Sequence, residues 1–167
     1  MGLEQHRRAA PERVRFGVLT ISDTRTAQSD LGGDFLAEAI AGAGHVLARR
    51  ELVRDEAPAI RAAIEAAVAD PEVDLVVATG GTGIAPRDVT FDTLRELLDS
   101  EIPGFGELFR RLSWREIGSA TILSRAIGGL RRGKVVLALP GSPKALRLAM
   151  DEIVLREAAH LVAQARG

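Results

Sequence analysis

The chain has 167 residues, 46% of them hydrophobic, which suffices for one domain with a buried core; it has no cysteine, which excludes disulfides, thiolate metal sites and cysteine nucleophiles. Its 22 basic and 23 acidic residues give a net charge of −1, and tyrosine is absent, so no nucleic-acid partner is expected. No apolar run approaches the roughly 20 residues that span a bilayer, so we expect no membrane partner. The absence of cysteine fits a reducing compartment, and we expect a cytoplasmic protein.

The N-terminal residues differ in character from the rest of the chain. Residues 1–12 are charged and lack the apolar segment that a signal peptide requires. We interpret them as a flexible tail, as chain ends usually are. Residues 13–167 show no repeat, linker or low-complexity stretch, and we expect them to form one domain.

In the first half of the domain, strand-like and helix-like patterns alternate. Runs of apolar and β-branched residues predict strands at 14–21, 45–53 and 75–78, and helical spacing of apolar residues predicts helices at 31–43 and 58–69. The run at 75–78 is apolar throughout, which is typical of a strand covered on both faces. The more polar segment 45–53 is expected nearer a sheet edge.

The second half continues the alternation. Thr90 is the expected N-cap of a helix over 90–98, and Ser142 the expected cap of a long C-terminal helix with Pro143 at its first position. The remaining predicted elements are a helix at 104–112, short strands at 121–123 and 126–130, and a strand at 135–139. This order predicts an α/β fold with a mostly parallel sheet, helices on both faces, and an antiparallel hairpin near 126–139.

Ligands of an open parallel sheet bind beyond the carboxyl ends of its strands, and four turns of this chain are expected there. The turn at 20–25, taken alone, is best interpreted as an ordinary capped turn. In the turn at 53–56, Pro58 disfavours helical geometry at Ala57, so the following helix should begin at Pro58. Asp55 then lies outside the usual cap position and is free to point into a site.

The third turn, at 79–88, is rich in glycine. Gly80, Gly81 and Gly83 leave Thr82 as the only side chain among four residues, so backbone N–H groups can approach an anion closely. A flexible loop is the alternative interpretation. We favour the anion site because a buried strand leads directly into the loop and Asp88 ends it.

The fourth turn, at 139–144, places Gly141 before the N-cap Ser142. The N–H groups of the first helical turn favour an anion, and Lys144 adds positive charge. A well-formed N-cap without a ligand is an equally good interpretation of this turn alone.

Together the four turns predict a crevice in which two anion-binding loops face two carboxylates, Asp55 and Asp88. Carboxylates beside phosphates usually hold Mg²⁺. None of the three histidines, His6, His45 and His160, falls in a candidate turn, which argues against a catalytic triad. Residues 128–134 resemble a phosphate-binding loop, but they lead into a strand and predict a hairpin turn.

The turns, in this order, resemble the MoaB/Mog family of molybdenum cofactor biosynthesis proteins. The resemblance covers nearly the whole chain from about Val14, and the Gly-Gly-Thr-Gly segment with its trailing Asp-Val-Thr is its most specific part. The matching segments are 20–25, 55–56, 79–83, 87–90 and 139–142. Residues 103–109, 116–118 and 124–125 are similar to the MoaB branch rather than to the Mog branch.

The resemblance implies a three-layer α/β/α sandwich that assembles as a homotrimer or a dimer of trimers. It also implies a pocket for molybdopterin, a pterin dithiolene with a terminal phosphate. In transferase members of the family, this phosphate attacks the α-phosphate of ATP in the presence of Mg²⁺, which gives adenylylated molybdopterin and pyrophosphate.

The same resemblance assigns roles to residues. Asp55 and Asp88 match the family's two functional aspartates and are the expected catalytic residues and Mg²⁺ ligands. The residues implied in binding substrate and phosphate are Ser22, Asp23, Thr24, Gly80, Gly81, Thr82, Gly83, Thr90, Ser124, Arg125, Pro140, Gly141, Ser142 and Lys144. One departure is Gly32, which stands where many relatives have a serine hydroxyl.

Two questions remain open at the level of sequence. The protein is expected to be a molybdopterin adenylyltransferase, a carrier that binds molybdopterin without chemistry, or an oligomeric scaffold with a vestigial pocket. In addition, Phe109 and Trp114 fit a core and a subunit interface about equally, within an apolar stretch that also contains Phe105, Leu108 and Ile117.

Overall fold

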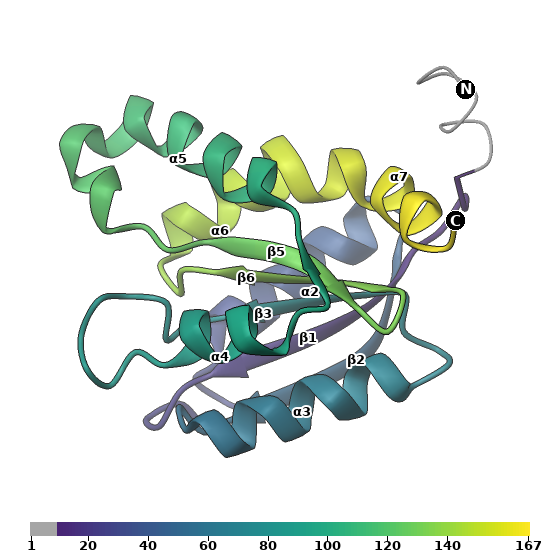
Figure 1. The fold of residues 1–167 in the computed structure, drawn as a ribbon, viewed down its shortest axis with the longest axis horizontal. Helices are drawn as coiled ribbons and strands as arrows, with labels where there is room; N and C mark the ends of the chain where they lie inside the picture. The colour runs from purple at the N-terminus through teal and green to yellow at the C-terminus, as the bar shows by residue number, and fades with distance from the viewer. Residues whose placement is uncertain (1–9) are drawn as a thin grey trace.

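The computed structural model describes residues 10–167, which form helices packed on both faces of one six-stranded sheet (Figure 1). Residues 1–9 of the predicted tail lie outside the described residues. The strands are β1 (Arg15–Ile21), β2 (Val46–Val53), β3 (Leu75–Thr79), β4 (Ser100–Glu101), β5 (Ile127–Arg131) and β6 (Lys134–Leu139).

The sheet has the order β2-β1-β3-β6-β5-β4. β1 runs parallel to β2 and β3, and β3 runs parallel to β6, whereas β5 is antiparallel to both of its neighbours. The predicted mostly parallel sheet, its antiparallel hairpin and the edge position of β2 are therefore confirmed. The loop that resembles a phosphate-binding loop is the β5–β6 turn, with Arg132 and Gly133 at positive φ.

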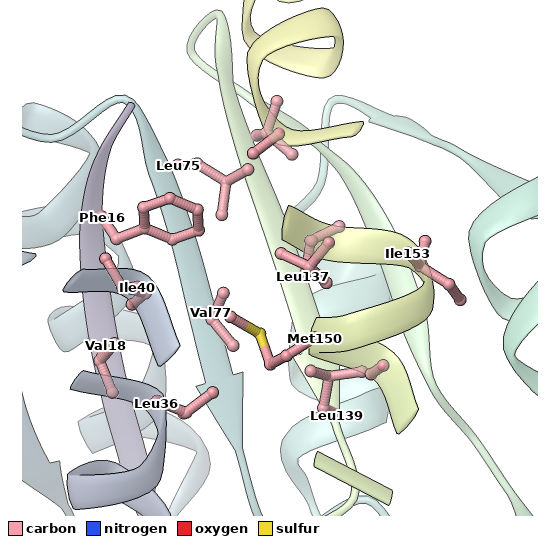
Figure 2. Packing of buried hydrophobic residues seen from close by; sticks show 14 of the residues in the cluster. Phe16, Val18, Leu36, Ile40, Leu75, Val77, Leu137, Leu139, Met150 and Ile153 are labelled. Carbon is pink, nitrogen blue, oxygen red and sulfur yellow. The ribbon is translucent and has the colours of Figure 1, made fainter. Parts of the chain in front are cut away.

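The helices form two layers. One face carries α2 (Leu31–Gly42), α5 (Pro103–Ile117), α6 (Pro143–Ala149) and α7 (Leu155–Ala165), and the other carries α3 (Ala57–Ala69) and α4 (Thr90–Leu97). In Figure 2, Phe16, Val18, Leu75 and Val77 of the central strands point toward Leu36 and Ile40 of α2 and toward Met150. This packing on both faces explains why β3 and β6 are apolar almost throughout.

Four details differ from the sequence-based expectations. Residues 121–123 are not a strand but the end of a 3₁₀-helix, η1 (Gly118–Leu123), because a segment of one threonine and two apolar residues is too short for its pattern to tell the two structures apart. Thr90 is not an N-cap: Val89 takes that position and the Thr90 side chain is fully buried. The remaining two differences are the continuation of α5 to Ile117 and a π-helical segment, η2 (Met150–Val154), between α6 and α7.

Within residues 10–167, no helix combines the length and the apolarity that crossing a bilayer demands.

Candidate functional site

A pocket of about 760 Å³ opens beyond the carboxyl ends of β3 and β6. One side of it is formed by the glycine-rich turn after β3 and by the turn after β6. The opposite side is apolar and comes from α5, η1 and α6; it comprises Phe109, Ile117, Ala120, Leu123, Ala145 and Leu148. The pocket thus joins a polar rim to an apolar wall, as small-molecule sites usually do.

The two glycine turns touch at the rim. The N–H of Gly80 donates to the carbonyl of Leu139 over 3.1 Å, which extends the β3–β6 ladder into the turns. A Cβ on Gly141 would lie 3.3 Å from the Cα of Gly80, so the backbones approach too closely for a larger residue to fit easily. Gly81 and Gly141, 60 residues apart in number, therefore border the same pocket.

Beneath Gly81 lie two oxygens that the fold leaves unpaired. Gly81 has a φ of +62°, and a Cβ there would come within 2.4 Å of the Thr90 Oγ1 and 2.7 Å of the Asp55 Oδ1. Among residues 10–167, neither oxygen has a hydrogen-bond partner, although both are buried. Buried polar atoms are normally paired, so these two are candidates for contact with a ligand or with its water.

Asp55 lies at the carboxyl end of β2, just before α3, and its side chain is partly buried. α3 begins at Ala57, so the expectation that it begins at Pro58 is wrong by one residue. Because its N-cap is Glu56, Asp55 still lies outside the cap position, as expected. Burial raises the pKa of Asp55 above its ordinary value, and the neighbouring carboxylates of Asp23 and Asp88 raise it further. A carboxyl group in this state favours a nearby positive charge.

Asp88 closes the glycine-rich loop and lines the pocket. Its Oδ2 accepts a hydrogen bond from the N–H of Ala85 over 3.2 Å, and a Cβ on Gly83 would lie 2.5 Å from the same oxygen. A side chain at position 83 would therefore displace the Asp88 carboxylate from its present place. The two predicted catalytic aspartates come together around this loop, with Asp88 at the surface of the pocket and Asp55 below Gly81.

The turn after β6 takes the expected form. Ser142 is the N-cap of α6, and its Oγ accepts a hydrogen bond from the N–H of Ala145 over 3.3 Å. Pro140, Gly141, Ser142 and Lys144 all line the pocket. The cap and the predicted site thus occupy the same turn, and one does not exclude the other.

The turn after β1 supports the site from outside. The Oγ of Ser22 accepts hydrogen bonds from the N–H groups of Thr24 and Arg25, which fixes the turn. The carboxylate of Asp23 accepts from the N–H of Asp55 over 3.1 Å and from the Arg87 guanidinium over 2.9 Å. Ser22, Asp23 and Thr24 do not line the pocket, whereas Arg25 does.

The two residues before β5 take different places. Ser124 lines the pocket, and its buried Oγ has no hydrogen-bond partner among residues 10–167. The Arg125 guanidinium instead does not line the pocket and donates to carbonyl oxygens of the glycine-rich loop. Of the predicted site residues, those placed on the pocket wall are Gly80, Gly81, Thr82, Gly83, Asp88, Ser124, Pro140, Gly141, Ser142 and Lys144.

Sequence reasoning missed most of the apolar wall and assigned no site role to Arg25. Phe109 is 1% exposed and belongs to the core as well as to the pocket, whereas Trp114 is 59% exposed. Arg25 stood within the matched turn at 20–25, which was the one available signal. Gly32 belongs to α2, and a Cβ at this position would lie 3.3 Å from the Leu146 side chain. A serine in place of Gly32 would therefore be crowded by Leu146.

Comparisons with known proteins agree with this geometry. Residues 17–160 match the family model described as "Probable molybdopterin binding domain". Molybdenum cofactor biosynthesis protein B of Halalkalibacterium halodurans is 45% identical over 163 residues, which cover 97% of this chain and 96% of that protein.

Solved structures show the same similarity. A crystal structure of a molybdenum cofactor biosynthesis protein B matches with a TM-score of 0.90 at 47% identity and covers 93% of this chain and 98% of that one. The tungsten cofactor synthesizing protein MoaB from Pyrococcus furiosus matches with a TM-score of 0.83 at 37% identity, covering 95% of this chain and 100% of that one. The family model covers most of the chain, and relatives of 45% and 47% identity align over nearly the whole of it. The chain therefore belongs to the MoaB/Mog family of molybdenum cofactor biosynthesis proteins.

Proposed function

We propose that the pocket binds molybdopterin and that the chain transfers the adenylyl group of ATP to the terminal phosphate of this ligand. One observation carries the proposal: two glycine turns with close backbone contact border a single pocket that also contains Asp88 and lies beside Asp55. Carriers need only the turns, whereas phosphoryl chemistry also uses carboxylates at the same place.

The polar rim is suited to phosphate groups. Backbone N–H groups of Gly80–Gly83 and of the turn at Gly141 can donate to phosphate oxygens without interference from a Cβ. Lys144 and Arg25 line the same pocket and add positive charge. The apolar wall around Phe109 and Leu148 offers a surface for the flat pterin ring.

The carboxylates fit Mg²⁺ that arrives with a nucleotide rather than a resident metal. Among residues 10–167, no cluster of three or more His, Cys, Asp or Glu side chains has the arrangement of a metal site. Mg²⁺ usually takes one or two carboxylates and completes its shell with phosphate oxygens and water. Asp88 and the unpaired Oδ1 of Asp55 would supply those carboxylates, and the ion would neutralise charge on the phosphates.

The proposed step is a displacement at phosphorus. An oxygen of the molybdopterin phosphate forms a bond to the α-phosphorus of ATP, and the bond from this phosphorus to the α,β-bridging oxygen breaks. Pyrophosphate leaves with that electron pair. The chain's own contribution is to hold both phosphate groups in place and to stabilise the charge that develops on them.

The test is to mix the protein with molybdopterin and Mg-ATP and to follow pyrophosphate release. Asp88→Ala should lower turnover by about 100-fold while the dissociation constant of molybdopterin changes by less than about threefold. Glu38→Ala, an exposed acid of α2, is the matched control. If the wild-type protein binds molybdopterin but releases no pyrophosphate, it is a carrier; if it binds no molybdopterin, only the scaffold function remains.

We also propose that the chain associates with itself as a homotrimer or a dimer of trimers. Large apolar side chains remain exposed along the end of α5 and along η1, with Trp114 at 59%, Ile117 at 50% and Ile122 at 80%. Patches of this kind usually mark protein interfaces. Light scattering at micromolar concentration is expected to give three or six times the mass of one chain, and the mass of a single chain would contradict the proposal.

A further inference from the structure

Arg125 makes contacts that set it apart from the other cations near the site. Its Nε donates to the carbonyl of Thr82 over 3.2 Å, and one Nη donates both to the carbonyl of Asp88 over 3.0 Å and to the carbonyl of Gly83. Its other Nη pairs with the Asp92 carboxylate over 2.8 Å. One guanidinium therefore gathers three carbonyl oxygens from the start and the end of the glycine-rich loop.

The position of Arg125 is fixed by α4. Its guanidinium lies 4.9 Å from the centre of the Phe91 ring, and its side chain is 24% exposed. Phe91 and Asp92 both belong to the first turn of α4, the helix that the loop leads into. Arg125, which does not line the pocket, thus connects the loop to the start of α4.

The hydrogen bonds from Arg125 to the loop carbonyls also orient the N–H groups of the same peptide planes. In a trans peptide the C=O and the N–H lie on opposite sides of the plane, so a carbonyl held by Arg125 turns the following N–H away from it. The amides in question belong to Gly83, Ile84 and Val89. Gly83 lines the pocket, and the amide of Val89 acts to lower the pKa of the Asp55 carboxyl group.

We propose that Arg125 is a positioning residue, which holds the glycine-rich loop so that its amides face the phosphate of the ligand and Asp55. The proposal rests on the function proposed above for the choice of ligand, but not for the ordering of the loop. It assigns Arg125 a role through the backbone rather than direct contact with substrate. Charge-assisted hydrogen bonds to three carbonyls make a neutral side chain a poor replacement.

The chain offers a matched control in Arg95. Its guanidinium lies 5.4 Å from the same Phe91 ring and pairs with the same Asp92 over 3.0 Å. These are the contacts that Arg125 makes with α4, without its contacts to the loop carbonyls. Arg95→Met therefore removes one cation from the same ring and the same carboxylate, while the hydrogen bonds from Arg125 to the loop remain.

The first measurement needs no ligand. Amide hydrogen exchange of the full-length protein is followed at Ala85, Asp88 and Thr90, whose N–H groups are bonded within the loop. Arg125→Met should raise their exchange rates by about tenfold, and Arg125→Lys, which cannot span three carbonyls, should raise them by nearly as much. Arg95→Met should leave them unchanged. Wild-type rates in a folded Arg125→Met or Arg125→Lys protein would overturn the proposal.

The second measurement is the affinity for molybdopterin, by calorimetry. Arg125→Met should raise the dissociation constant by about tenfold, and Arg95→Met should change it by less than about twofold. An Arg125→Met protein that binds as tightly as the wild type would also overturn the proposal. If the wild-type protein binds no molybdopterin, the proposed function fails, whereas the exchange measurement still decides the role of Arg125.

Discussion

The two ends of the sheet treat a buried carboxylate in opposite ways. At the amino end, Asp74 precedes β3 and is 5% exposed; its oxygens accept hydrogen bonds from the backbone N–H of Arg15, from two guanidinium nitrogens of Arg15 and from Arg166. At the carboxyl end, the Oδ1 of Asp55 is buried without a partner among residues 10–167.

The pKa values follow the same division. Burial alone would raise the pKa of Asp74, but the hydrogen bonds and the charge of Arg15, with the charge of Arg166, hold it below its ordinary value. The pKa of Asp55 is raised, because burial and the nearby carboxylates outweigh the lowering effects of the Val89 amide and the Arg87 charge. The comparison shows that the carboxylate that links strands, Asp74, has hydrogen-bond partners for its buried oxygens. The carboxylate beside the binding pocket, Asp55, keeps one buried oxygen without such a partner among residues 10–167.

The largest expected effect is at the amino end. Asp74→Ala leaves the guanidinium groups of Arg15 and Arg166 without their common partner, which should lower the free energy of unfolding by about 2–3 kcal/mol, since both arginines are partly exposed to water. Urea denaturation measures this loss, with Glu38→Ala as the surface control. A loss below about 1 kcal/mol would mean that the cluster does not hold β1 and β3 together, and the comparison would fail at this end.

The next effect is at the carboxyl end and on activity. Asp55→Asn keeps the size of the side chain but removes its charge, so turnover in the pyrophosphate assay should fall by about 100-fold. The melting temperature should stay the same or rise, because a partly buried charge with a raised pKa and an unpaired Oδ1 is removed. A drop in melting temperature as large as that of Asp74→Ala would show that Asp55 is a structural residue instead.

A smaller effect is expected where the glycine turns meet. In Gly141→Ala the new methyl group lies 3.3 Å from the Cα of Gly80, so one turn must shift and molybdopterin should bind about tenfold more weakly. Gly42→Ala is the control, since no atom lies within 4 Å of a Cβ at that position. If Gly141→Ala and Gly42→Ala bind molybdopterin equally tightly, the close contact between Gly80 and Gly141 does not contribute to ligand binding.

The smallest effect sharpens the comparison through pH. A carboxyl group with a raised pKa keeps its proton in the folded state where the unfolded chain has lost it, so the wild type loses stability as pH rises from the ordinary aspartate pKa through that of Asp55. The gain in unfolding free energy from Asp55→Asn should therefore be near zero in acid and grow toward neutral pH. It should stay below about 1 kcal/mol, because water screens a partly exposed group.

Asp23 is expected to give the opposite sign. The Arg87 guanidinium lowers the pKa of Asp23, so this carboxylate stabilises the fold above its ordinary pKa and ceases to do so as pH falls. Parallel melting curves of Asp23→Asn and Asp55→Asn across pH check both signs at once. The same slope in both variants would contradict the electrostatic difference between them.

Much of the architecture could be predicted because local patterns carry it. The apolar runs at β3 and β6, the helical spacing from Leu31 onward and the Ser142-Pro143 start of α6 are properties of short segments. Where a pattern was short, as at 121–123, the prediction was wrong, because a three-residue segment fits a 3₁₀-helix as well as a strand. The boundary between core and surface in α5 was also undecided by sequence, since Phe109 and Trp114 differ only in the face on which they lie.

The site divides along the same line. The sequence by itself determined which turns lack side chains, that Asp55 escapes the cap of α3, and that the parallel strands bring these turns to one edge. Only the tertiary structure decided that the Asp23 carboxylate accepts a hydrogen bond from the N–H of Asp55. It also decided that Phe109 and Leu148 line the pocket and that Arg125 donates to the carbonyl of Thr82 in the loop. The reason is physical: backbone preferences depend on neighbours in the chain, whereas the partner of a guanidinium depends on which carbonyls the packed helices and strands bring within its reach.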